Sequence, residues 1–290
     1  MSSLDPVSLA ALLRSDVAAY NAAVAGAGRV SLRGADLGGL DLRAANIEGA
    51  DLTGADLSNS QVEGSFLARC RLEGTKLDGV VVDDYWRPII AKLQALWAGA
   101  AIWNGQRVPG EPVMLASADL TGARLAGVDL SDAFLSGARL DGADLRGATL
   151  KNVVLEDASL RGAVLESANL RFTKMPGATL DGARFDGATL RHVDLIDADA
   201  RGTSFARATI TGGQWQGSDL TDATFEAATI TKVMLNSAKL AGTSFRGATL
   251  TEVSFVSTET SAASFEGATC VGCLDMATLE GGPPFVPHPN

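Results

Sequence analysis

Residues 113–150 read VMLASADLTGARLAGVDLSDAFLSGARLDGADLRGATL, and the pattern they set continues to residue 272. At every fifth position from Leu115 to Cys270, 29 of the 32 residues are Leu, Ile, Phe, Met or Trp. Two positions before each of these, all 32 residues are Ala, Val, Thr, Ser or Gly. A period of five fits neither an α-helix nor a β-strand. The stretch therefore predicts a repeat architecture that grows by stacking.

A shorter array of the same kind occupies residues 29–82, with apolar residues at every fifth position from Leu32 to Val82. Its GADLTGADL and the GADLRGATL of the longer array resemble the A(D/N)LxX signature of pentapeptide-repeat proteins. The resemblance covers roughly 43 repeats, 11 in the first array and 32 in the second. It implies an all-β solenoid, the right-handed quadrilateral β-helix, with four repeats in each coil. In that fold the large residue and the small residue two places before it point inward.

Aromatic residues test the 20-residue coil independently of the resemblance. Five phenylalanines fall 20 residues apart, at Phe185, Phe205, Phe225, Phe245 and Phe265. Trp215 and Phe255, which are 40 apart, share a different column. Periodicity therefore predicts four sides per coil, so that residues 113–272 form about eight coils and a rod of about 38 Å. Gly122 and the other glycines two places after a large residue suit the corners.

The remaining segments are predicted to be helical or irregular. Residues 1–28 read as a helical cap, with Asp5 as N-cap and Pro6 at the first helical position. Residues 83–112 interrupt the repeat, and an apolar stripe between Pro88 and Gly105 predicts an inserted helix. Residues 273–290 are predicted to be an irregular cap or tail, because their prolines cannot continue a β ladder.

Three of the four tryptophans, Trp86, Trp97 and Trp103, lie in or beside this inserted helix. Two interpretations remain open for them. The helix packs on the solenoid, or its tryptophans reach a partner as interaction hot spots.

Composition narrows the function classes. The 34 acidic and 24 basic residues give a net charge of -10, which disfavours generic binding to nucleic acid or anionic membranes. The N-terminus lacks a basic signal region, and no apolar run approaches about 18 residues, so we expect a cytoplasmic protein. With only two histidines and no phosphate-binding motif, the sequence predicts no enzyme, no cofactor and no metal.

Three cysteines predict no disulfide framework. Cys70 and Cys270 read as small inward residues. A zinc site at the CxxC of Cys270 and Cys273 lacks a second cysteine pair.

Sorting the longer array by column gives four faces. The third face, centred on Leu150, Leu190, Ile210, Ile230 and Leu250, is rich in threonine and is interrupted by Lys151, Arg171 and Arg191. The fourth face is centred on Leu135, Leu155, Met175, Leu195, Trp215, Leu235 and Phe255. Its outward positions include apolar residues flanked by acidic ones, a composition typical of a contact surface. The candidate interface residues are Phe134, Val154, Ile196, Met234, Val256, Glu156, Asp157, Asp194 and Asp197.

Two functions follow from these features. The first is a non-enzymatic scaffold that binds a protein partner through the fourth face, the inserted helix or both. The second comes from the resemblance, because some pentapeptide-repeat proteins mimic DNA, bind DNA gyrase and confer antibiotic resistance. Such members often dimerise end to end and carry a projecting loop, so the resemblance also implies a homodimer. Charge density opposes uniform mimicry: residues 113–272 hold 19 acidic and 14 basic residues, net -5, against about 22 charges on duplex DNA of that length.

Overall fold

The computed structural model, which describes residues 5–258, 262–275 and 285–286, pairs each coil with the next at an offset of 20 residues. The offset holds in the first array, where Ser31 pairs with Asp51, and in the second, where Phe134 pairs with Val154. All of these pairs are parallel. The four-sided β-helix predicted from the sequence is therefore confirmed.

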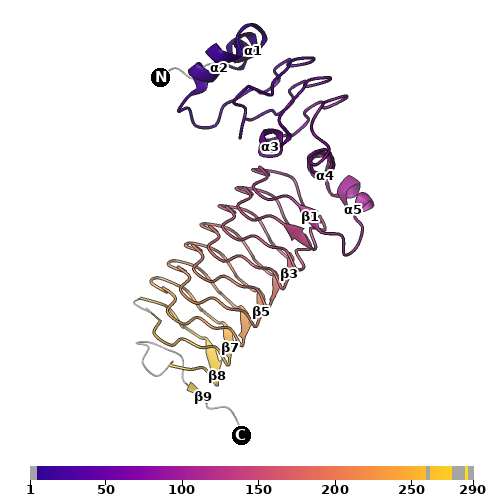
Figure 1. Ribbon diagram of the computed structural model, residues 1–290. Coiled ribbons are helices and arrows are strands. Elements are labelled where there is room, and N and C mark those ends of the chain that lie inside the picture. Colours follow the sequence, from indigo (N-terminus) through magenta and orange to yellow (C-terminus); the bar gives the residue numbers. More distant parts are fainter. Residues whose placement is uncertain (1–4, 259–261, 276–284, 287–290) are drawn as a thin grey trace. The chain divides into compact units, whose positions relative to one another are not determined.

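Contacts divide the chain into two units. The first comprises Met1–Gly105 and Ser117–Leu120, and the second comprises Gln106–Ala116 and Thr121–Asn290. In the second unit, successive coils appear in Figure 1 as rungs with the strands aligned along one side. Strands β1 (Val113–Met114) and β2 (Ala133–Phe134) pair on the fourth face. The third face carries β3 (Asn169–Arg171), β4 (Thr189–Arg191), β5 (Thr209–Thr211), β6 (Thr229–Thr231), β7 (Thr249–Thr251) and β8 (Thr269–Val271).

Corners between the sides require a left-handed backbone. Gly122, for example, has φ +66° and Gly147 has φ +63°. Glycine adopts this conformation without the Cβ clash that other residues suffer. Polar residues fill other corners, among them Asp157 at φ +55° and Asp197 at φ +54°. The predicted corner positions are confirmed.

The interior is filled by one large and one small side chain per side. The five-phenylalanine column forms a continuous stack, with ring centroids 4.9–5.0 Å apart. Where threonine replaces the small residue, its hydroxyl donates to a backbone carbonyl, as Thr203 does to Leu180 at 2.8 Å. A buried hydroxyl paired in this way avoids most of its desolvation cost. Inward threonines therefore fit this interior without a ligand.

Within the described residues, five helices accompany the coils. Residues 1–28 were expected to form one helix, but the structure has α1 (Pro6–Ser15) and α2 (Val17–Val24), separated by Asp16. The Asp16 side chain accepts a hydrogen bond from the amide of Ala19 and so begins a new helix. Asn21 then binds the first array, donating to the carbonyl of Ala44 and accepting from the amide of Asn46, both at 2.8 Å.

The inserted helix also differs from the expectation. It is divided into α4 (Arg87–Ala98) and α5 (Ala100–Gln106) by Gly99, whose φ of +107° cannot continue a helix. A further short helix, α3 (Gly64–Leu67), replaces one side of a coil in the first array. Leu67 remains fully buried there, as the repeat predicts.

The prediction that the cysteines form no disulfide is wrong. Cys270 and Cys273 are joined, with their Cα atoms 6.2 Å apart. Both are inward residues on either side of a corner that turns at Gly272, φ +64°, and this turn brings residues i and i+3 together. Beyond it, β9 (Phe285–Val286) pairs with β8. The predicted tail otherwise lies largely outside the described residues. None of the helices in the described part of the chain is long and apolar enough to cross a membrane.

Candidate protein-binding surface

The tryptophans of the inserted helix belong mainly to the packing of the first unit. Trp86 lies against Gly64 of α3, where a Cβ atom would come within 2.3 Å of the Trp86 Cβ. The guanidinium of Arg71 lies over the Trp97 ring, 5.4 Å from its centroid. Trp103 is only 2% exposed. These contacts favour the packing interpretation, and Trp103 offers almost no surface to a partner.

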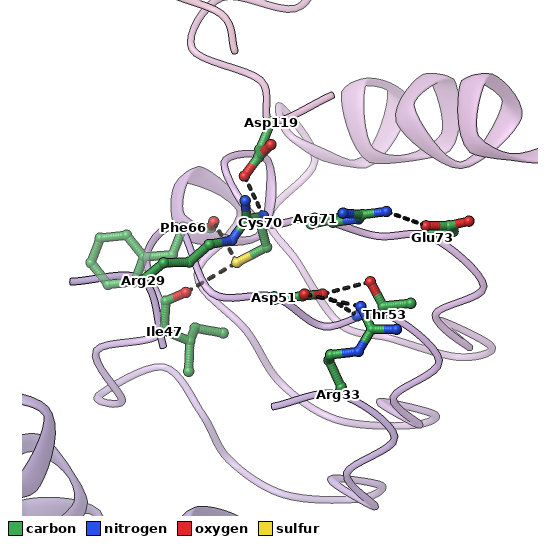
Figure 2. Close-up of polar contacts among 10 residues, drawn as sticks. All are labelled: Arg29, Arg33, Ile47, Asp51, Thr53, Phe66, Cys70, Arg71, Glu73 and Asp119. Atoms are coloured by element: carbon green, nitrogen blue, oxygen red, sulfur yellow. Dashed lines mark hydrogen bonds and ion pairs between the residues drawn. The ribbon is translucent and has the colours of Figure 1, made fainter. Parts of the chain in front are cut away.

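A buried polar cluster of the first unit also has a structural role. Figure 2 shows Asp119 paired with Arg29, close to Cys70. The Cys70 thiol donates to the carbonyls of Ile47 at 3.0 Å and Phe66 at 3.2 Å, and burial raises its pKa to about 12. A thiol with so high a pKa carries almost no thiolate at neutral pH and is not a nucleophile. Among the described residues, no group of three or more His, Cys, Asp or Glu could hold a metal ion.

The fourth face exposes apolar side chains in two patches. At its N-terminal end, Met114, Phe134 and Val154 occupy one column on three consecutive coils. Met114 is 46% exposed and Phe134 40%, while Val154 is half-buried. Polar residues follow in this column, so the apolar strip is not continuous. The second patch contains Met234, 37% exposed, and Val256, 38% exposed.

The four candidate acids of the fourth face lie between and beside these patches. Glu156, Asp157 and Asp197 are exposed, and Asp194 is half-buried, as is the apolar Ile196. Within the described residues, no lysine or arginine nitrogen lies within 4.0 Å of any of these four carboxylates. No ion pair in the described part of the chain therefore offsets these carboxylates, although Lys174 is the neighbour of Asp194 in the preceding coil.

Asp157 and Asp197 also form corners of their coils. A Cβ atom on Gly177 would lie 2.4 Å from an Asp157 carboxylate oxygen, and one on Gly217 would lie 2.2 Å from Asp197. Each carboxylate thus lies over the glycine of the next coil. Asp and Gly alternate along this corner because a side chain in one coil fills the space above the next. The corner thus places the two carboxylates in one column, two coils apart.

Acids on the other faces are often paired with arginine. Arg146 lies 2.6 Å from Asp144 and Arg201 lies 2.7 Å from Asp199. Hydrogen bonds from these guanidinium groups lower the pKa of the Asp144 and Asp199 carboxyls. Such surface pairs stabilise the fold little, but they reduce the negative potential that a partner would meet. The four acids of the fourth face have no such arginine partner among the described residues, so the negative potential there is reduced less.

Several exposed apolar residues of the coils were missed in the sequence, among them Met114, Phe172 and Leu274. Met114 shares the column of Phe134 one coil earlier, so extending the column count would have found it. Phe172, 43% exposed, occupies a corner at φ +56°. Phe172 could have been recognised as a large aromatic residue at a corner position, where the repeat usually has Gly, Asp or Asn.

Comparison with known families matches these repeats directly. The model described as "Pentapeptide repeats" matches in 8 copies, at residues 29–59, 118–157, 143–182, 174–207 and 183–222. The chain belongs to the pentapeptide-repeat family. A search of curated proteins gave no match for this pentapeptide-repeat protein.

Solved structures of other pentapeptide-repeat proteins resemble the chain at low sequence identity. HetL from the cyanobacterium Nostoc sp. strain PCC 7120, involved in heterocyst differentiation regulation, is 22% identical, with a TM-score of 0.37. That match covers 88% of this chain and 91% of HetL. QnrB1, a plasmid-mediated fluoroquinolone resistance protein, is 18% identical in one trypsin-treated form, with a TM-score of 0.41. This second match covers 57% of this chain and 85% of QnrB1.

Proposed function

We propose that this pentapeptide-repeat protein is a non-enzymatic scaffold that holds a basic segment of a partner protein on its fourth face. The observation that carries the proposal is the set of four carboxylates without ion pairs, set among exposed apolar side chains. Phe134 and Met234 supply apolar surface for the partner, and Glu156 and Asp194 supply charge. Interfaces commonly combine an apolar centre with such a polar rim.

Replacing Phe134, Ile196 and Met234 together by Asp is expected to reduce capture of the partner by at least about tenfold, because it places charge in the apolar centre. Tagged wild-type and variant proteins would be used to capture partners from a native lysate, with quantification by mass spectrometry. The matched control carries Asp at the exposed Asn169, Thr209 and Thr249 of the third face, each two coils from the next, and should retain the partner. An identical capture profile for wild type and the fourth-face variant would contradict the proposal.

The acids provide an independent test of the partner's charge. Changing Glu156 to Gln, and Asp157, Asp194 and Asp197 to Asn, should weaken capture and reduce its dependence on salt. Asn tolerates the left-handed corner and has nearly the shape of Asp, so this variant should fold normally. Capture that stays as strong and as salt-dependent as that of the wild type would exclude a basic partner at these residues.

Local DNA mimicry toward a gyrase or another topoisomerase is the second candidate, since the same four carboxylates form no ion pairs among the described residues. It predicts that the purified protein inhibits DNA supercoiling or rescues it from a quinolone, and that the four amide substitutions weaken the effect. No effect at micromolar protein would eliminate this candidate. Light scattering on the same samples would establish whether the protein is a homodimer.

A further inference from the structure

A ladder of basic side chains crosses this acidic protein at one edge of the third face. Lys151, Arg171 and Arg191 occupy the same column on three consecutive coils, and Arg171 and Arg191 are direct partners in the β3–β4 register. Lys174 lies around the corner on the fourth face, where it pairs with Val154 and Asp194 of the neighbouring coils. All four side chains are exposed. The coils are about 4.8 Å apart, so the cationic groups are close neighbours.

This basic ladder lacks the acidic partners that most other basic residues of the coils have. Arg146, Arg184, Arg201, Lys239 and Arg246 each form an ion pair. In the described part of the chain, by contrast, no acidic oxygen lies within 4.0 Å of the four cations of the ladder. The residues across the strand are the neutral Thr149, Asn169 and Thr189, and the one acid that follows Lys174 in its column is Asp194.

Like charges in register repel one another and destabilise a sheet. The ladder therefore costs the fold stability rather than adding to it. A bound anion would remove this repulsion.

An exposed aromatic pair borders the ladder. Phe172 stacks on His192, with ring centroids 5.3 Å apart and planes 9° apart. The Arg171 guanidinium lies 5.0 Å from the Phe172 ring centroid. Phe172 has φ +56°, a conformation that is unfavourable for a large side chain. The same corner column holds Asn152, Gly212 and Gly272, which suit this backbone, but also His192, Lys232 and Glu252; Phe172 is its one large apolar residue among the described coils. An exposed aromatic side chain at such a corner contributes nothing to the interior and is available to a ligand.

We propose that the basic ladder, with Phe172 beside it, binds an acidic peptide segment that carries an apolar side chain. Arg171 and Arg191 match carboxylates with their planar pairs of donors, while Lys151 and Lys174 add charge at either side. The apolar side chain of the peptide packs on the exposed face of the Phe172–His192 pair. Lys151, Arg171, Arg191 and Phe172 lie outside the fourth face. Lys174 lies on it, between Val154 and Asp194 in their column, so the two sites are adjacent.

A peptide fits better than a nucleic acid. The protein's charge of -10 repels a long polyanion, whereas a short acidic segment meets mainly the local field of four cations. The carboxylates of a peptide are carried on flexible Asp and Glu side chains, so their spacing can adjust to the spacing of the cations in the ladder.

Fluorescence anisotropy with a labelled Glu-rich peptide containing one central Trp tests the site. The full-length protein should bind this probe, and an otherwise identical Gln-rich peptide should bind at least about tenfold more weakly. Arg171→Gln with Arg191→Gln should weaken binding by at least about tenfold. The matched control is Arg124→Gln with Arg139→Gln, which should leave affinity unchanged. Arg124 and Arg139 lie elsewhere on the coils and match the ladder arginines in two respects. Both are exposed, and among the described residues neither has an acidic oxygen within 4.0 Å.

The Phe172→Asn variant distinguishes an effect on peptide binding from an effect on stability. Asn accepts the left-handed corner, so the variant should melt at the same temperature as the wild type or higher, yet bind the Trp-containing peptide more weakly. Absence of probe binding, equal binding by the Arg171/Arg191 variant, or tighter binding of a single-stranded oligothymidylate would each overturn the proposal. Loss of the peptide site with partner capture intact would leave the fourth-face function standing.

Discussion

Replacing Phe225 by alanine is expected to lower the free energy of unfolding by about 3–5 kcal/mol, because it removes a buried ring and leaves a cavity. Phe225 is 1% exposed and stacks on Phe205 and Phe245, each with a centroid distance of 4.9 Å and an interplanar angle of 5°. The cavity would interrupt the column in the middle of the second unit. Denaturant titration followed by circular dichroism would measure the loss.

Phe265→Ala is the matched control. Phe265 is the last ring of the same column, 4% exposed, and stacks on one column neighbour, Phe245. We expect it to cost clearly less than Phe225→Ala. An equal or larger cost at Phe265 would show that the column is not stabilised by its continuity.

Gly213→Ala is expected to destabilise the protein by about 2–4 kcal/mol, although it restores the alanine that the repeat prefers at that position. Gly213 has φ +129°, and a Cβ atom there would lie 2.5 Å from the Val193 carbonyl oxygen and 3.0 Å from the Trp215 Nε1. That same carbonyl accepts a hydrogen bond from Trp215 Nε1 at 3.0 Å. Glycine therefore makes the room that the largest inward side chain needs.

Two further variants make this explanation specific. Gly142→Ala, at φ +63° with no atom within 4 Å of the added Cβ, should cost only about 1 kcal/mol, from backbone strain alone. Gly213→Ala combined with Trp215→Leu recreates an ordinary repeat, so its cost should fall below the sum of the two single changes by at least about 1 kcal/mol. Strict additivity would rule out crowding between residues 213 and 215 as the cause. Denaturant titrations of the wild type, Gly142→Ala, Gly213→Ala, Trp215→Leu and the double variant would measure these costs.

Much of the fold could be predicted because the residues of each pentapeptide determine the structure of one side of a coil. The large inward residue, the small one two places earlier and the corner residue fix one side of a coil, and the phenylalanine column fixes four sides per coil. The sequence could not predict how helices break, because those breaks depend on single residues. Asp16 caps a second helix, and Gly99 leaves the helical conformation at φ +107°.

Predicting the surface was harder, since exposure depends on three-dimensional neighbours. The sequence identified Phe134 and Met234 as outward residues, and both are more than one-third exposed. It could not show that Trp103 is buried, because the insertion has no repeat to set its orientation. Nor did it find Phe172, whose exposure follows from its corner position. The Cys270–Cys273 disulfide was missed because two inward cysteines meet only across a turned corner.

The most direct test of the fourth-face scaffold is photo-crosslinking in cells, with benzoylphenylalanine placed singly at residues 134, 234, 209 and 229. Positions 134 and 234 lie on the fourth face, and positions 209 and 229 are exposed threonines of the third. The scaffold predicts that the first two positions crosslink to the same basic protein partner and that the threonine positions do not. Equal crosslinking from both faces, or none from residues 134 and 234, would contradict it.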